Sequence, residues 1–212
     1  MSLLQPVKAE SLSSQVADTI RAAIFNRELL PGQVIRELAL AKSLQVSQAT
    51  VREALAQLES FGLVVRTPNR STSVNSLSEA EVRDRLTVRL TLEKLAFEQA
   101  MPFLSAEEIE SLRKLAERFF ASRDGKDWAL IVETERAFFH QAWMLSHNAV
   151  LCRILDQLTT PLYAIWTERQ PATRAAIESL LQALENRDLQ AVHATLQPPP
   201  LAESASAGEP KS

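Results

Sequence analysis

The sequence predicts a mainly α-helical protein, with an N-terminal winged helix-turn-helix that has a two-stranded wing and a C-terminal all-α antiparallel helical bundle. Three observations support this fold class. Leu, Ala, Glu and Arg are abundant and the 212 residues include only four glycines, which favours helices. Residues 12–77 show three short helical patterns followed by two strand patterns. Residues 78–197 show amphipathic helical patterns almost throughout.

The composition also excludes several protein classes. No apolar run reaches the roughly 18 residues of a membrane span, and the N-terminus lacks a secretory signal, so we expect a cytoplasmic protein without membrane contact. The single cysteine, Cys152, excludes an internal disulfide, and its apolar neighbours indicate a buried structural thiol. The net charge of −3 is uneven, because residues 1–77 are slightly basic and residues 78–212 are acidic. Such asymmetry is typical of a chain in which one part meets a polyanion.

The first domain is expected at residues 1–77. A helix at 12–27 follows capping serines, and a Pro-Gly break separates it from a second helix at 36–45. The side chains of this second helix that should face inward are Leu38, Ala41 and Leu44. Ser47 caps a third helix that ends at Gly62. Its apolar stripe consists of Val51, Ala54, Leu55 and Leu58. Strands at 63–67 and 72–77 flank the turn "PNRS" and form the wing.

This order of elements predicts DNA binding, with residues 47–61 as the recognition helix. Its first residues face base edges in the major groove, and the candidate contacts are Ser47, Gln48, Thr50 and Arg52. Gln suits adenine, Arg suits guanine or a phosphate, and Thr suits the thymine methyl group. Arg66 and Arg70 lie on the wing, where a cation reaches phosphate or the minor groove. The alternative is a solvated amphipathic helix in which Arg52 pairs with Glu53 or Glu59.

The second domain is expected at residues 78–197. Capping boxes at Ser78 with Glu81 and at Ser105 with Glu108 begin helices at 79–101 and 106–123. Further helices are expected at about 127–146, 148–168, 171–186 and 188–196, with Pro161 kinking or dividing one of them. The inward side chains of the 79–101 helix should be Val82, Leu86, Leu90, Leu95 and Ala96. Residues 198–212, rich in Pro, Ala and Ser, should be a disordered tail.

The stretch "ELALAKSLQVSQATVREALAQLESFGLV", followed by "PNRSTSV", closely resembles the DNA-binding domain of GntR-family bacterial transcription regulators. In the second domain, "RLTLE", "FFHQAWMLSHN" and "ALENRDLQA" resemble the FCD ligand-binding domain of the FadR-like branch. The resemblance covers about residues 10–197. It implies a homodimeric repressor or activator that binds an inverted-repeat operator in double-stranded DNA, and we expect a repressor. A small acidic effector in the helical domain would then change DNA affinity.

The resemblance also implies DNA contacts residue by residue. The family positions fall on Ser47, Gln48, Ala49, Thr50 and Arg52, with Arg70 on the wing. The family commonly has Arg, Thr and Pro where this chain has Gln48, Ala49 and Thr50, and its usual wing glycine is Ser71 here. One forked donor is therefore missing, which changes the expected operator bases and leaves the mode of binding unchanged.

Many members of this branch hold a divalent metal through an Asp, a His four residues later and two further His. Here His140 matches the first His, whereas Arg136 stands at the Asp position. The two later positions fall on Ile177 and near Pro199. His140 is thus the only retained ligand, and we expect no metal or other cofactor. A zinc or nickel site of His140 with Glu133 or Glu135 is the alternative.

Arg136 predicts a different chemistry, because a guanidinium can hold the carboxylate of an effector bidentately. Arg89, with Arg85 one turn earlier, would be a second clamp, while His140 would line the cavity and Trp143 would stack nearby. The alternative is that these arginines pair with Glu93, Glu133 or Glu135 and only order the bundle.

Two other function classes are disfavoured. The chain has three His and one Cys, and it lacks a Gly-rich phosphate loop, G-x-S-x-G and H-E-x-x-H, so we expect no enzyme. A protein-binding module that uses the wing on a partner is the other class. Salt dependence separates it from a DNA-binding protein, because phosphate contacts weaken steeply with salt.

Overall fold

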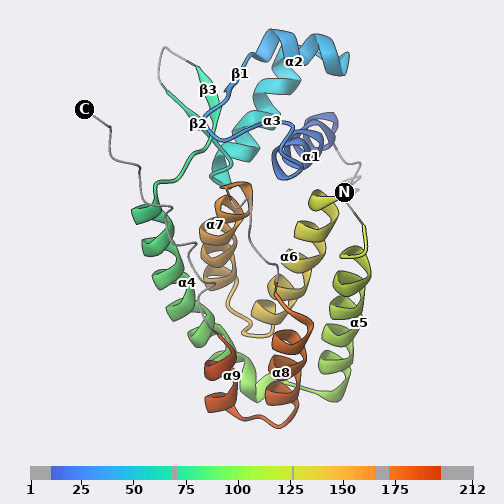
Figure 1. Cartoon of the computed structure of the whole chain (residues 1–212), viewed down its shortest axis with the longest axis vertical. Helices are drawn as coiled ribbons and strands as arrows, with labels where there is room; N and C mark the ends of the chain where they lie inside the picture. Colours follow the sequence, from blue (N-terminus) through green and yellow to red (C-terminus); the bar gives the residue numbers. More distant parts are fainter. Residues whose placement is uncertain (1–10, 68–70, 126, 166–171, 197–212) are drawn as a thin grey trace, which may run out of the picture.

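The computed structural model describes residues 11–67, 71–125, 127–165 and 172–196. Two units stand one above the other along the longest axis (Figure 1). The upper unit contains helices and a small sheet, and the lower unit is helical. Arg70, predicted as a DNA contact, and the tail at 198–212, predicted as disordered, lie outside the described residues. Within the described ranges, no helix has both the length and the apolar character needed to cross a bilayer.

The upper unit is the predicted winged helix-turn-helix. Its elements are α1 (Leu12–Phe25), β1 (Val34–Ile35), α2 (Glu37–Leu44), α3 (Gln48–Ser60), β2 (Val64–Arg66) and β3 (Thr72–Val74). Ser11 and Ser47 cap α1 and α3 by accepting from backbone N–H groups one turn later. Gly62 follows α3 with φ of 70°, the left-handed conformation that favours glycine. These local signals place the elements where the sequence predicts them.

The wing has the predicted hairpin and one additional strand. The sheet order is β1-β3-β2, and both pairs are antiparallel. Val34 pairs with Ser73, and Ser73 pairs with Val65 on its other side. The sequence predicts only a short extended piece after the Pro-Gly break, and pairing with β3 makes two of its residues the strand β1.

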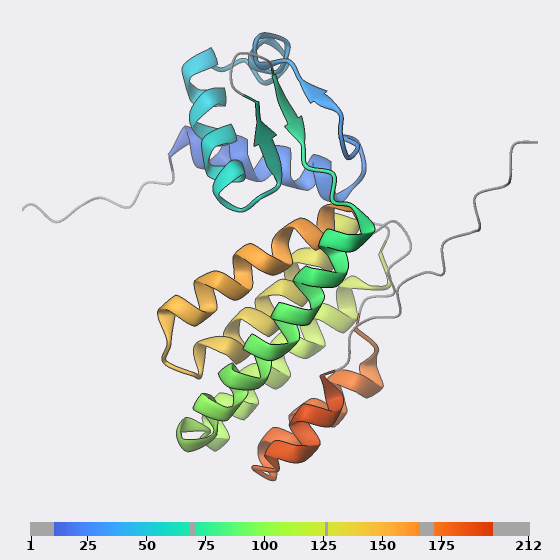
Figure 2. The same ribbon diagram turned by 90° about the vertical axis from the view of Figure 1, so that its left-hand side faces the viewer.

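The lower unit contains helices α4 (Glu79–Ala100), α5 (Ala106–Ser122), α6 (Trp128–Met144), α7 (Ala149–Ile165), α8 (Arg174–Glu185) and α9 (Leu189–Thr195), with a 3₁₀ turn at Met101–Phe103. Both predicted capping boxes are present. Figure 2 shows α4 and α7 side by side on the near face, with α5 and α6 behind them. Pro161 is predicted to kink or to divide α7, and this helix continues through it as one element, so the division does not occur.

Two side chains predicted to face inward face solvent. Leu38 in α2 is 65% exposed and Leu95 in α4 is 39% exposed. In each case the residue two positions later, Leu40 or Phe97, packs inward instead. Side chains two positions apart point about 200° apart around the helix axis, so burial of one directs the other outward. The choice between them depends on the neighbouring helix.

The two units share part of one hydrophobic core. Ala129 and Val132 of α6, with Tyr163 and Ala164 of α7, belong to the cluster that contains the core of the upper unit. The amide of Ala129 donates to Asn26 Oδ1 at 2.8 Å, so a residue after α1 helps to cap α6. A Cβ on Gly62 would lie 2.9 Å from Pro161 Cγ, which shows how closely α7 approaches the turn after α3.

The core of the lower unit is aromatic and aliphatic. Its fully buried side chains include Phe97, Phe119, Phe138 and Trp143. Cys152 is 2% exposed, as predicted, and burial raises the pKa of its thiol. An uncharged, buried thiol is a weak nucleophile, so Cys152 contributes packing.

Candidate functional site

Helix α3 has one fully buried face and one face exposed to solvent. Val51, Ala54, Leu55 and Leu58 are each 0% exposed, as the sequence predicts. The opposite face carries Gln48, Ala49 and Arg52, which are half-buried or exposed. The cap fixes the start of the helix, because Ser47 Oγ accepts from the Thr50 amide at 3.0 Å. Of the predicted contacts, Gln48, Ala49 and Arg52 therefore lie together at the N-terminal end and on the outward face of α3, where Ser47 begins the helix.

A carboxylate of α2 holds two of these side chains. Glu37 Oε2 accepts from Arg52 Nε at 2.8 Å and from Gln48 Nε2 at 3.3 Å. The sequence-based alternative paired Arg52 with Glu53 or Glu59, whereas its partner is Glu37 on the preceding helix. A separation of 15 residues gives no periodic signal, so sequence reasoning missed Glu37.

Arg66 of β2 lies against α3 and braces it. Its Nη2 donates to the carbonyl oxygen of Arg52 at 2.7 Å, and its Nε lies 3.5 Å from Glu59 Oε2. The side chain is 34% exposed. The sequence predicts a phosphate or minor-groove contact for Arg66, and the structure adds a contact that ties the wing to α3.

A polar cluster between α6 and α7 contains two of the predicted effector residues. His140 Nδ1 lies 2.8 Å from Asp156 Oδ2, without the alignment of a hydrogen bond. Arg136 Nη1 lies 3.7 Å from Asp156 Oδ1, which is longer than a hydrogen bond. Sequence reasoning missed Asp156, although a single carboxylate in the apolar stretch "RILDQL" is a signal that could have found it.

This cluster does not fit the divalent metal of the resembled family. The Arg136 guanidinium is permanently positive and lies beside the Asp156 carboxylate, where a cation would need a further negative ligand. Glu135, the other expected donor, is 2% exposed and accepts from the backbone amide of Ala172 at 3.0 Å. His140 and Asp156 are the two metal-type donors that the described residues bring together here.

Arg89 forms a buried ion pair with Glu93, one of the partners that the alternative interpretation names. Its Nη2 lies 2.9 Å from Glu93 Oε1, and its guanidinium stacks over the Phe139 ring at 5.7 Å from the centroid. Burial, the largest single effect, lowers the pKa of Arg89, but the attraction of Glu93, Tyr163 and Glu135 together outweighs it, so this pKa lies above its usual value. Arg89 is therefore held inside the bundle by Glu93 and by the Phe139 ring.

The other two predicted effector residues also have structural contacts. Arg85 Nη1 lies 3.4 Å from the Gln157 carbonyl oxygen and 3.5 Å from that of Leu158, so it ties α4 to α7. Trp143 is 0% exposed and packs on Phe139 with ring centroids 6.2 Å apart. Both differ from the predicted cavity lining, because helix packing places one at a seam and the other in the core.

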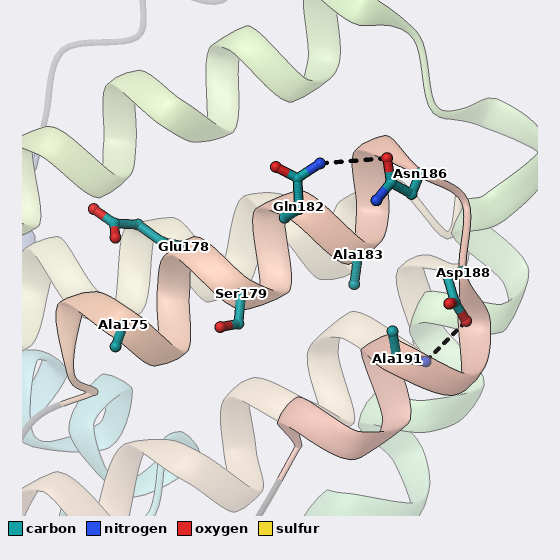
Figure 3. Close-up of a pocket in the computed structure, with 8 residues that line it drawn as sticks. All are labelled: Ala175, Glu178, Ser179, Gln182, Ala183, Asn186, Asp188 and Ala191. Carbon is teal, nitrogen blue, oxygen red and sulfur yellow. Dashed lines mark hydrogen bonds between the residues drawn. The ribbon is translucent and has the colours of Figure 1, made fainter.

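A surface hollow of about 520 Å³ lies between α8 and α9 (Figure 3). Its lining residues are Ala175, Glu178, Ser179, Gln182, Ala183, Asn186, Asp188 and Ala191. The polar groups are largely used within the protein: Gln182 donates to Asn186 at 3.3 Å, and Asp188 caps α9. We therefore assign this hollow no function.

Both domains match known protein families. Residues 12–74 match the model described as "Bacterial regulatory proteins, gntR family", and residues 84–197 match the FCD domain. Among solved structures, that of E. coli McbR/YncC has a TM-score of 0.72 and 26% sequence identity, and the similarity covers 89% of this chain and 92% of that one.

Two curated relatives extend this similarity. The "Uncharacterized HTH-type transcriptional regulator YdhC" of Bacillus subtilis (strain 168) is 32% identical over 68% of this chain and 65% of the relative. The gluconate operon transcriptional repressor of Bacillus licheniformis is 30% identical over 69% of this chain and 61% of the relative. The chain thus spans slightly less than two thirds of the length of each of these two relatives.

Proposed function

Because the chain belongs to the GntR family of bacterial regulatory proteins and carries an FCD domain, we propose that it is a repressor that binds a specific operator in double-stranded DNA through α3. The observation that carries the proposal is the outward face of α3, where Gln48 and Arg52 are held side by side above a fully buried stripe. A similar chain is named a repressor, which supports the sign of regulation. A cytoplasmic location, where DNA is accessible, is part of the proposal.

Arg52→Ala is expected to weaken specific operator binding by about 1–3 kcal/mol, because it removes a forked donor from the major groove. The operator is first selected from a random duplex library with the wild-type protein. Binding of that duplex is then measured by fluorescence anisotropy at several salt concentrations. Arg113→Ala is the matched control, since Arg113 is an exposed arginine of α5 that pairs with Glu185 far from α3. Equal affinities of wild type and Arg52→Ala would contradict the role of α3.

We further propose that a small organic carboxylate binds at Arg136 and His140. The 3.7 Å gap between Arg136 and Asp156 leaves guanidinium N–H groups available for a bidentate contact. The two side chains are 32% and 40% exposed, so a ligand can reach them. They lie on α6, whose first turn packs in the core of the DNA-binding domain. A ligand that shifts α6 would therefore act on the domain that carries α3.

A thermal-shift screen of mono-, di- and tricarboxylic acids tests this site. At 100 times its Kd, a ligand stabilises the native state by about 2.7 kcal/mol. This should raise the Tm by roughly 5–10 °C in a chain of this length. Arg136→Gln should abolish the shift, and Arg153→Gln, which changes an exposed arginine of α7, should retain it. A shift that persists in Arg136→Gln would place the ligand elsewhere.

Finally, we propose that two copies associate through the exposed face of α4 and α7. Val88 and Leu95 of α4, with Val150 and Ile154 of α7, are 39–56% exposed. The contacts of Arg85 with Gln157 and Leu158, and of Gln99 with Asn148, show that the two helices run antiparallel. This register places Val88 beside Ile154 and Leu95 nearest to Val150. The 22 residues of α4 span about 33 Å. Each helix is about 10 Å wide, so the area of the two-helix face approaches the roughly 800 Å² that each partner buries in a stable interface.

A further inference from the structure

We propose that Glu37 is a positioning residue that presets Gln48 and Arg52 for reading base edges. This inference rests on the proposed DNA-binding function and deepens it. One carboxylate oxygen, Glu37 Oε2, contacts both side chains, at 2.8 Å from Arg52 Nε and 3.3 Å from Gln48 Nε2. In this proposal Glu37 does not touch the bases and acts through its two neighbours.

For Arg52, the contact selects which atoms remain free. Glu37 uses Nε, so the two terminal nitrogens stay available as a fork. Guanine presents two acceptors, O6 and N7, to such a fork in the major groove. The Arg52 side chain is 59% exposed, and Arg66 holds its backbone carbonyl at 2.7 Å. Arg52 is thus held through its backbone carbonyl and its Nε atom, whereas its two terminal nitrogens are free within the described part of the chain.

For Gln48, the contact selects the orientation of the amide. A carboxylate only accepts hydrogen bonds, so Nε2 must face Glu37 and Oε1 must face away. This leaves one N–H donor and one acceptor on the outer side, the pair that matches N7 and N6 of adenine. Without Glu37 the Gln48 amide can rotate, so the positions of its donor and its acceptor relative to a base can be exchanged.

Glu37 is itself well placed for this task. It is the first residue of α2, where a negative charge is favourable beside the free N–H groups of the helix. Its side chain is 24% exposed, and Leu40, Ala41 and Leu44 of the same helix pack in the core shared with α3. The carboxylate is therefore fixed relative to α3. Gln48 and Arg52 are then ordered before DNA binds, so less side-chain conformational entropy is lost on binding.

The test compares DNA selections from a random-sequence duplex library. Wild type, Glu37→Ala and Glu37→Gln are each selected, and the affinities for the wild-type consensus and its single-base variants are measured. The control is Glu53→Ala, which removes the same charge from an exposed position of α3. Glu37→Ala should lose about tenfold in discrimination at the bases read by Gln48 and Arg52, a change equivalent to about 1.4 kcal/mol. Glu37→Gln keeps an acceptor oxygen at the same reach and should lose less.

Each outcome decides one claim. A wild-type protein that enriches no motif overturns the proposed DNA-binding function itself. A wild-type motif that Glu37→Ala reads with equal discrimination overturns the positioning role and leaves the function standing. Equal broadening by Glu53→Ala also overturns it, since charge alone would then explain the effect. If Glu37→Ala fails to fold, Glu37→Asp decides: it keeps the charge but is one methylene shorter, and unchanged discrimination would contradict the proposal.

Discussion

Replacing Glu93 with alanine is expected to lower the free energy of unfolding by about 3–5 kcal/mol, the range observed when one partner of a buried ion pair is removed. The side chains of Arg89 and Glu93 are only 8% and 6% exposed, and they meet at 2.9 Å. Without Glu93, the guanidinium of Arg89 loses its ion-pair partner inside the bundle. Water cannot replace that partner fully at a buried site. Urea denaturation followed by circular dichroism measures the change.

The matched control is Glu185→Ala. It breaks the Arg113–Glu185 pair, which has a comparable distance of 2.7 Å but side chains that are 42% and 48% exposed. Exposed pairs contribute about 0–1 kcal/mol, so this variant should remain close to wild type. Replacing both Arg89 and Glu93 with leucine should recover much of the loss, because no charge then stays buried. Similar losses in Glu93→Ala and Glu185→Ala would show that burial does not govern the Arg89 contact.

Placing aspartate at both Val88 and Ile154 is expected to convert a dimer into a monomer and to reduce operator affinity by about 10²–10⁴-fold. The antiparallel register places the two side chains beside each other on the proposed α4–α7 face, and they are 47% and 39% exposed. Four like charges would then meet across a two-fold interface. In a dimer, binding of the first half-site holds the second DNA-binding domain close to the second half-site, which raises its effective concentration. A monomer lacks this advantage, and its loss accounts for the expected reduction of about 10²–10⁴-fold.

Size-exclusion chromatography with light scattering gives the mass, and anisotropy with a two-half-site duplex gives the affinity. Leu130→Asp is the control, because Leu130 is 46% exposed on α6, away from the α4–α7 face. It should stay dimeric and bind the operator normally. A double variant that remains dimeric would show that another surface joins the copies. A monomeric wild-type protein would contradict dimerisation itself.

The elements whose limits depend on neighbouring residues could be predicted from the sequence. Ser47, Ser78 and Ser105 cap their helices, and Gly62 follows α3 in a left-handed conformation. A cap satisfies N–H groups within one turn, so its signal is complete within four residues. The buried stripe of α3 was equally clear, because four apolar residues at helical spacing leave one possible inward face.

The sequence by itself therefore determined the order of the elements, the outward face of α3 and the resemblance that the family matches confirm. The tertiary structure decided the partners of the charged residues. Arg52 contacts Glu37, Arg89 is buried with Glu93, and His140 meets Asp156. Long charged side chains reach several carboxylates with similar local energies, so spacing along the chain cannot choose among them. The choice is made when helices pack, because packing decides which charges are buried and which carboxylate lies within reach.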